Sequence, residues 1–139
     1  MHQSIVIETP GRALIDITSE INAALQREGL KDGLCHLFIR HTSASLLINE
    51  NADPDVLRDL ETWFGDLVVD GDERFRHRAE GPDDMAAHIR SALTQTSLSI
   101  PVTKGRLMLG TWQGIYLWEH RHARHQRTVV ATFISFGER

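Results

Sequence analysis

The segment His41-Thr42-Ser43-Ala44-Ser45-Leu46-Leu47-Ile48-Asn49-Glu50-Asn51-Ala52-Asp53-Pro54 places a histidine, hydroxyls, amides and carboxylates around a short apolar run. A buried strand face normally carries apolar residues, because each polar group placed there must find a partner or cost free energy. Asp53 and Pro54 are residue types that favour the N-cap and the first position of a helix. The segment therefore predicts a strand that leads into a helix, with a polar cluster where they meet. A turn capped by Asn and Asp side chains is the alternative.

The composition is that of an ordinary globular protein. The 139 residues, of which 41% are hydrophobic and 24% charged, fit one domain spanning residues 1–139. The net charge of −4 argues against a general nucleic-acid binder. The single cysteine, Cys35, excludes an intrachain disulfide and fits a reducing compartment. The sequence shows no signal-peptide pattern and no apolar run near about 18 residues, so we expect a cytoplasmic protein without a membrane or nucleic-acid partner.

Apolar periodicity predicts both strands and helices. Strands are expected at residues 4–8, 13–17, 33–40, 45–49, 97–102, 106–109, 114–121 and 128–136. Alternation within 33–40 places Cys35, Leu37, Ile39 and His41 on one face and Leu34, His36, Phe38 and Arg40 on the other. Helices are expected from Thr18 or Ser19 to Gly29, from Pro54 to about Gly65, and from Pro82 to about Leu93. The apolar stripe of the second helix is Val56, Leu57, Leu60, Trp63 and Phe64, and that of the third is Met85, Ile89, Ala92 and Leu93. Runs of strands with segregated helices predict an α+β domain with a mostly antiparallel sheet.

Three of the eight histidines stand among polar residues: His41, His77 and His88. Imidazoles from separate elements are typical ligands of a catalytic zinc site, which keeps one position for water. The expected helices contain no His-x-x-x-His motif and the chain has no cysteine pair, so only folding would bring such ligands together. A hydrogen-bonded structural role is the alternative for each histidine.

The carboxylates that we consider for a site are Glu50, Asp53 and Glu119. Glu119 follows a strand that is apolar on both faces, so its burial would be costly without a partner such as Arg121 or a histidine. A glutamate that reaches solvent at the end of the strand is the alternative.

A second polar block lies at Gly105–Gly114. Gly110 and Gly114 flank Thr111-Trp112-Gln113, which predicts a bend that lets a ligand approach the backbone closely. Amides of such a bend, with Thr111 and Ser43, suit phosphate oxygens, and Trp112 suits stacking on a heteroaromatic ring. Trp112 as a core residue is the alternative. The run His120–Arg127 fits a solvated hairpin tip, or a guard for an anionic substrate in which arginine binds phosphate.

Three ordered blocks carry a resemblance to a known family. The segment 41–54, the segment Gly81-Pro82-Asp83-Asp84-Met85-Ala86-Ala87-His88-Ile89 and the segment Leu109-Gly110-Thr111-Trp112-Gln113-Gly114-Ile115 resemble the signature of the YjbQ family. The resemblance implies a compact sandwich of mostly antiparallel strands with two to three helices. It also implies a homotrimer with sites near subunit interfaces. The implied activity is that of a secondary thiamine-phosphate synthase, which joins a pyrimidine methyl diphosphate to a thiazole phosphate and releases pyrophosphate.

The resemblance also implies a site. It places His41, His77 and His88 near a metal or anion site, with Asn49, Glu50 and Glu119 close by. We therefore expect His41, His77 and His88 to hold a divalent metal, zinc or magnesium. The expected catalytic residues are His41, Glu50, His88 and Glu119, and the expected substrate- and phosphate-binding residues are Ser43, Asn49, Thr111, Trp112, Gln113 and Arg121.

Two other functions remain open. Magnesium prefers carboxylates and water, whereas three histidines suit zinc better and point toward hydrolysis. The first alternative is therefore a metal-dependent hydrolase of a small phosphorylated or acyl substrate. The second is a non-catalytic trimeric protein that binds a small molecule.

Overall fold

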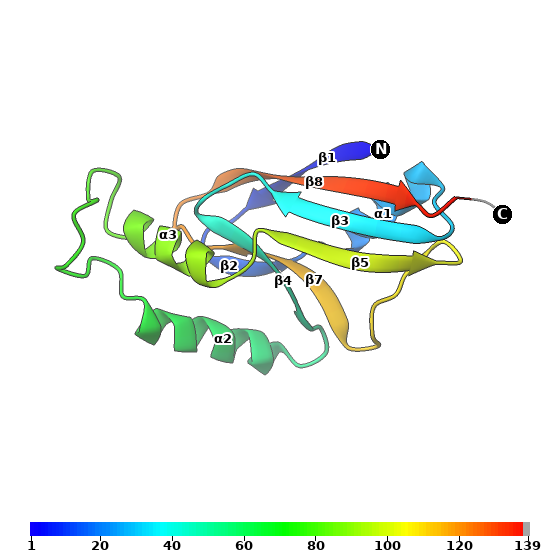
Figure 1. The fold of residues 1–139 in the computed structure, drawn as a ribbon. Coiled ribbons are helices and arrows are strands. Elements are labelled where there is room, and N and C mark those ends of the chain that lie inside the picture. The colour runs from blue at the N-terminus through cyan, green and yellow to red at the C-terminus, as the bar shows by residue number, and fades with distance from the viewer. Residues whose placement is uncertain (138–139) are drawn as a thin grey trace.

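The structure is a computed structural model and describes residues 1–137. Its strands form two sheets in which all paired strands run antiparallel, so the predicted α+β class is confirmed (Figure 1). The larger sheet has the strand order β1-β8-β3-β5-β6 and the smaller one β2-β7-β4. The elements in chain order are β1 (His2–Thr9), β2 (Ala13–Asp16), α1 (Thr18–Glu28), β3 (Gly33–Ile39), β4 (Ala44–Glu50), α2 (Pro54–Leu67), α3 (Asp84–Leu93), β5 (Ser97–Thr103), β6 (Arg106–Leu107), β7 (Gln113–Glu119) and β8 (His125–Ser135).

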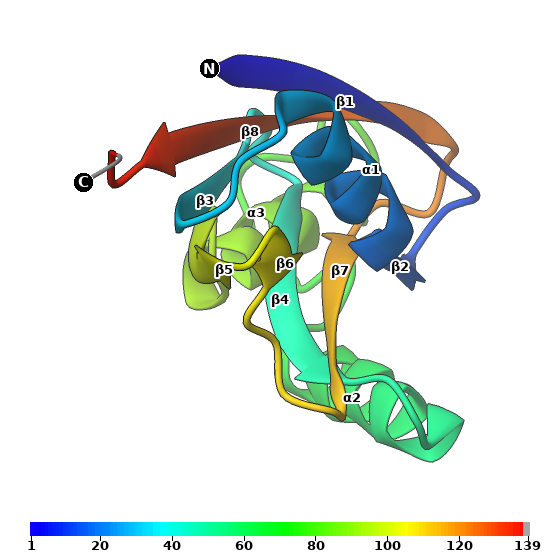
Figure 2. The same cartoon turned by 90° about the vertical axis from the view of Figure 1, so that its right-hand side faces the viewer.

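One core joins both sheets and α1. Figure 2 shows α1 beneath β1, on the side where it lies between the two sheets. Its residues Ile21, Ala24 and Leu25 are buried in the same cluster as the inward-facing residues of the strands. The alternation predicted for β3 is confirmed, because Leu37 is fully buried whereas the adjacent Phe38 is 45% exposed on the opposite face.

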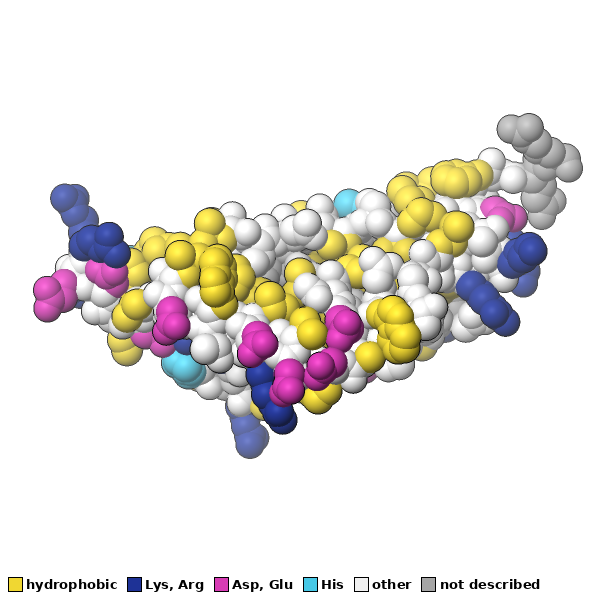
Figure 3. All heavy atoms as spheres, turned by 90° about the horizontal axis from the view of Figure 1, so that it is seen from below, with side chains coloured by type: hydrophobic (Ala, Val, Ile, Leu, Met, Phe, Trp, Pro, Cys, Tyr) yellow, Lys and Arg dark blue, Asp and Glu magenta, His cyan; other side chains and the backbone are white. Residues whose placement is uncertain are grey.

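Helix α2 lies outside the two sheets (Figure 1) and contacts β7 through Phe64, whose ring centroid lies 4.8 Å from that of Trp118. Its start is as predicted, with Pro54 in the first turn and the Asp53 side chain accepting from the amide of Asp55 at 2.9 Å. None of its residues is buried, and Trp63 and Leu67 are 60% and 53% exposed. Figure 3, which views this side of the molecule, shows hydrophobic side chains exposed among acidic ones. The helix is therefore amphipathic, and the described part of the chain covers its apolar face only in part, leaving Trp63 and Leu67 exposed.

Helix α3 turns a different face inward from the one that its sequence predicts. The expected stripe of Met85, Ile89, Ala92 and Leu93 is wrong, and Leu93 is 56% exposed. The buried residues are Asp84, Ala86, Ala87, Arg90 and Ser91. The small alanines allow a close approach to the sheet. The acidic first turn of the helix is bound by Arg121, as described below. No helix among residues 1–137 is long and apolar enough to cross a membrane.

The two faces of β3 give a direct test of where the core lies. We expect Leu37→Ala to lower the free energy of unfolding by about 2–5 kcal/mol, because it leaves a cavity between the sheets. We expect the matched Phe38→Ala to cost less than about 1 kcal/mol, because that side chain is partly exposed. Denaturant unfolding of both variants measures the difference. Equal losses would contradict this assignment of the buried face.

Candidate functional site

Two histidines and an aspartate converge at the start of α3. The Nε2 atoms of His77 and His88 lie 2.6 and 3.0 Å from the same oxygen, Oδ2 of Asp84. The three candidate ligand atoms lie within 4.8 Å of one another, as a metal site requires. We call this group the His–Asp cluster. Asp84 and His88 come from one face of α3, four residues apart, and His77 comes from the loop before the helix.

The environment of His88 favours a cation in this cluster. Its Nδ1 lies 2.9 Å from the backbone oxygen of Thr42, and its Nε2 faces the carboxylate of Asp84. A neutral imidazole carries one N–H, so it can donate to only one of these two acceptors. Either a second proton or a metal ion satisfies the other nitrogen. The hydrogen bond to the Asp84 carboxylate raises the pKa of His77, which favours the protonated imidazole.

Arg121 fixes the carboxylate of the cluster. Its guanidinium donates to Oδ1 of Asp84 at 2.7 Å, to Oδ2 of Asp83 at 3.0 Å and to the backbone oxygen of Glu80 at 2.9 Å. Burial opposes the ionisation of Asp83, but the hydrogen bond from Arg121 outweighs it and lowers the Asp83 pKa to about 2. Arg121 is therefore bound to the carboxylates of Asp83 and Asp84 in this structure.

A second charged group, fully buried, lies behind the cluster. The Glu119 carboxylate accepts from Nε of Arg127 at 2.7 Å, from Oγ1 of Thr9 at 2.8 Å and from the amide of Arg121 at 3.1 Å. Burial favours the neutral acid, but these donors outweigh it and hold the pKa of Glu119 below its usual value. Glu119 thus needs the partner that its sequence context predicted. That partner is Arg127 rather than the side chain of Arg121.

His41 belongs to this buried group and lies outside the His–Asp cluster. Its Nε2 accepts from the amide of Thr128 at 2.8 Å, and its Nδ1 lies 3.4 Å from Nη1 of Arg127. Burial and the charge of Arg127 lower the pKa of His41, so the ring is a neutral acceptor. In the described residues Asp84, and not His41, is the third member beside His77 and His88.

The expected binding residues divide between the two ends of β4 and β7. Ser43 lies at the buried end, where its Oγ accepts from Arg127 at 2.9 Å. Glu50 pairs with Gln113 at the other end of the same two strands. At the usual rise per residue of a strand, the two ends of β4 are about 20 Å apart. The residues at that far end are Asn49, Glu50, Thr111, Trp112 and Gln113. Within one chain, the structure does not bring them to the His–Asp cluster.

The polar contacts at the far end are local. Oδ1 of Asn49 accepts from the amide of Glu50 at 2.7 Å, and Oε2 of Glu50 accepts from the amide of Asp53 at 3.2 Å. Oε1 of Gln113 accepts from the amide of Gly110 at 2.7 Å, which closes the predicted bend. Trp112 is exposed on this bend and is not a core residue.

Sequence reasoning missed Asp84 and Arg127. The sequence patterns include Asp84 only as part of the segment 81–89 and assign it no role in a site. Its spacing of four residues from His88 is the signal that places both on one helix face. Arg127 stood in a run that suits a solvated hairpin tip, and nothing in the local sequence distinguishes this buried arginine from its exposed neighbour Arg124.

Comparisons with known proteins give one consistent family. Residues 3–136 match the family described as UPF0047 protein YjbQ-like. A UPF0047 protein of Synechocystis sp. is 59% identical over 130 residues, which cover 93% of this chain and 88% of that protein. The UPF0047 protein YjbQ of Escherichia coli O157:H7 is 43% identical, with 94% of each chain covered.

Solved structures share the fold. A YjbQ/UPF0047 family protein of Clostridium acetobutylicum has a TM-score of 0.82 at 35% identity, covering 96% of this chain and 99% of that one. A hypothetical protein of Aeropyrum pernix K1 has a TM-score of 0.88 at 29% identity, covering 97% and 98%.

The buried pair of Glu119 and Arg127 yields a stability prediction. We expect Glu119→Gln and Arg127→Met each to lower the free energy of unfolding by about 3–5 kcal/mol, because each leaves a buried charge without its counterion. The double variant should lose less than the sum of the two. Denaturant unfolding of the four proteins gives the coupling energy.

An exposed ion pair serves as the control. The side chains of Asp55 and Arg58 are 3.0 Å apart and largely exposed, so Arg58→Ala should cost at most about 1 kcal/mol. Additive losses at Glu119 and Arg127 would show that the two side chains do not act as a pair.

Proposed function

The chain belongs to the YjbQ-like family of UPF0047 proteins, and we propose that it is a metal-dependent enzyme acting on a small phosphorylated substrate. The observation that carries this proposal is the convergence of His77, Asp84 and His88 on one point at the start of α3. Two imidazoles and a carboxylate are a ligand set that proteins use for divalent metals.

The donor set fits zinc better than magnesium. Magnesium prefers oxygen ligands and keeps several waters, whereas imidazole nitrogens suit zinc. In this proposal Asp84 takes the place that we expected His41 to fill. A metal held there would supply Lewis-acid stabilisation of charge on phosphate oxygens.

The residues around the cluster orient its ligands. The backbone oxygen of Thr42 accepts from Nδ1 of His88, which leaves the lone pair of Nε2 for a metal. Arg121 holds Oδ1 of Asp84, which leaves Oδ2 toward the two histidines. Arg121 is thus a positioning residue in this proposal, and the buried pair of Glu119 and Arg127 supports the strand ends that carry Thr42 and Arg121.

Two reactions are compatible with such a site. The first is the thiamine-phosphate synthase reaction that the family resemblance implies, in which pyrophosphate leaves the pyrimidine methyl carbon and the thiazole phosphate nitrogen takes its place. The second is hydrolysis of a small phosphorylated substrate, which the zinc-like donor set favours. In both, negative charge develops on the oxygen of the leaving group and needs stabilisation.

We also propose that the protein is cytoplasmic and acts as a homotrimer. The exposed apolar residues of α2, Trp63 and Leu67, support association of the chain with copies of itself. Association would also offer a way for the far-end residues Asn49, Glu50 and Trp112 to approach the cluster of another subunit.

Metal binding tests the cluster directly. Metal-free wild type titrated with zinc in a calorimeter should bind it stoichiometrically, and His88→Ala and Asp84→Asn should bind at least about 100-fold more weakly, because each loses a direct ligand. His36→Ala is the matched control, since His36 lies on β3 and contacts Ser99 at 3.2 Å, away from the cluster. Wild-type zinc affinity in both cluster variants would remove these side chains from the metal set.

Steady-state kinetics tests the reaction. We expect the zinc-loaded enzyme to form thiamine phosphate from the two precursors, or to release phosphate from a panel of phosphoesters, at about 1 per second or faster. His88→Ala should lose the activity and His36→Ala should keep it. Only trace rates in both assays, unaffected by His88→Ala, would contradict an enzymatic role and favour a binding protein.

A further inference from the structure

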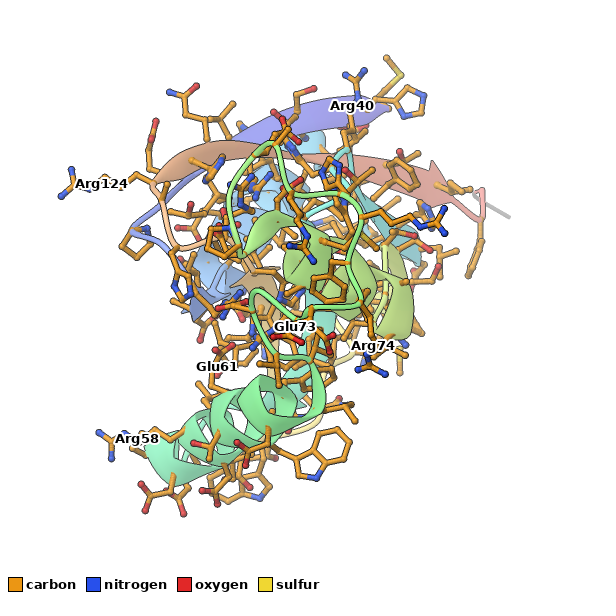
Figure 4. The ribbon with its side chains drawn as sticks, turned by 90° about the vertical axis from the view of Figure 1, so that its left-hand side faces the viewer. Arg40, Arg58, Glu61, Glu73, Arg74 and Arg124 are labelled. Carbon is orange, nitrogen blue, oxygen red and sulfur yellow. The ribbon has the colours of Figure 1, made fainter. Side chains whose placement is uncertain are left out.

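The segment between α2 and α3 is a closed loop with its own hydrogen bonds. The amide of Gly71 donates to the backbone oxygen of Pro82 at 2.8 Å and so joins the two ends of the loop. Inside it, the Arg78 guanidinium donates to the backbone oxygens of Phe75 and Glu73, both at 2.7 Å. Figure 4 shows the loop from the side, with Glu73 and Arg74 labelled on it. Such compact loops, with their ends close together, are often functional.

This loop contains a cavity that borders the His–Asp cluster. Its volume is about 270 Å³. The lining residues are Gly71, Asp72, Phe75, His77, Arg78, Gly81 and Pro82. His77 belongs to both sites, because its ring lines the cavity while its Nε2 faces Asp84 at 2.6 Å. A ligand in the cavity therefore lies beside the proposed metal position.

The walls of the cavity suit an aromatic group next to an anion. Phe75 and Pro82 supply apolar surface, and an aromatic ring packs well on another ring. Asp72 is neutralised by Arg74, whose Nη2 lies 2.6 Å from its Oδ2. No carboxylate within residues 1–137 pairs with Arg78, which leaves its positive charge for a ligand.

We propose that this cavity receives the ring of a small aromatic phosphate ester whose phosphate oxygens bind at the His–Asp cluster. The inference rests on the proposed function, because the metal at the cluster is the anchor for the phosphate. The volume lies near the lower end of ligand cavities, so it accommodates a single ring and not a nucleoside. Phe75 is then the residue that selects aromatic over short alkyl phosphate esters.

Two probes that differ in the ring test this selection. Calorimetric titration of the zinc-loaded protein with benzyl phosphate and with methyl phosphate should show about tenfold tighter binding of benzyl phosphate, as ring stacking in a cavity provides. Phe75→Ala should remove most of this preference and leave methyl phosphate binding unchanged. Phe75→Leu, which keeps an apolar wall, should retain part of it. Phe38→Ala, a partly exposed phenylalanine on the larger sheet, should behave as wild type.

The outcomes separate the two proposals. Zinc affinity is measured in every variant, and because the loop supplies His77, an unchanged value shows that the loop remains folded in Phe75→Ala. Equal binding of the two esters by zinc-loaded wild type would overturn the ring cavity and leave the metal site standing. A wild type that binds no zinc would overturn the proposed function and this inference with it.

Discussion

The buried ion pair between Glu119 and Arg127 is the constraint on which the end of the fold that carries the His–Asp cluster depends. Two charges without access to water are tolerated only when nearly every donor and acceptor is satisfied, and the contacts of Thr9 and Ser43 complete the set. These contacts hold together β1, β7, β8 and the turn before β4. The same turn carries the backbone oxygen of Thr42 that orients His88. The geometry of the His–Asp cluster thus depends on a charge pair in the interior.

Two arginines six residues apart neutralise the carboxylates of this region. Arg127 points inward to Glu119, and Arg121 holds Asp83 and Asp84 at the start of α3. The amide of Arg121 also donates to Glu119, so one carboxylate fixes the chain from which both arginines extend. Helix α3 is attached through its acidic first turn and packs on the protein through Ala86 and Ala87, so the apolar stripe that its sequence suggests is not its buried face. This explains why Leu93 is exposed while Asp84 is buried.

Local patterns predicted what local physics decides. The alternation of β3, the Asp53 cap and the need of Glu119 for a partner are properties of short segments, and each is confirmed. The choice of Arg127 as that partner depends on how β8 of the larger sheet meets the end of β7 in the smaller sheet, which the sequence of either strand does not contain. The same limitation applies to Glu50 and Trp112, which lie in polar segments near the others in sequence and at the opposite end of β4 in space. Periodicity predicted α3 but assigned it the wrong buried face, because the face that is actually buried carries the polar residues Asp84, Arg90 and Ser91.

The division of the His–Asp cluster between a helix and a loop restricts how the family can vary. Asp84 and His88 are separated by one helical turn, so substitutions elsewhere on α3 leave their relative positions unchanged. His77 has no such protection, because its position depends on the number of residues between Gly71 and Pro82, whose backbone contact closes the loop. Loops usually absorb insertions and deletions over evolutionary time. In this fold a change of length within that closed segment would separate the histidine from its partners, so length variation is expected outside it.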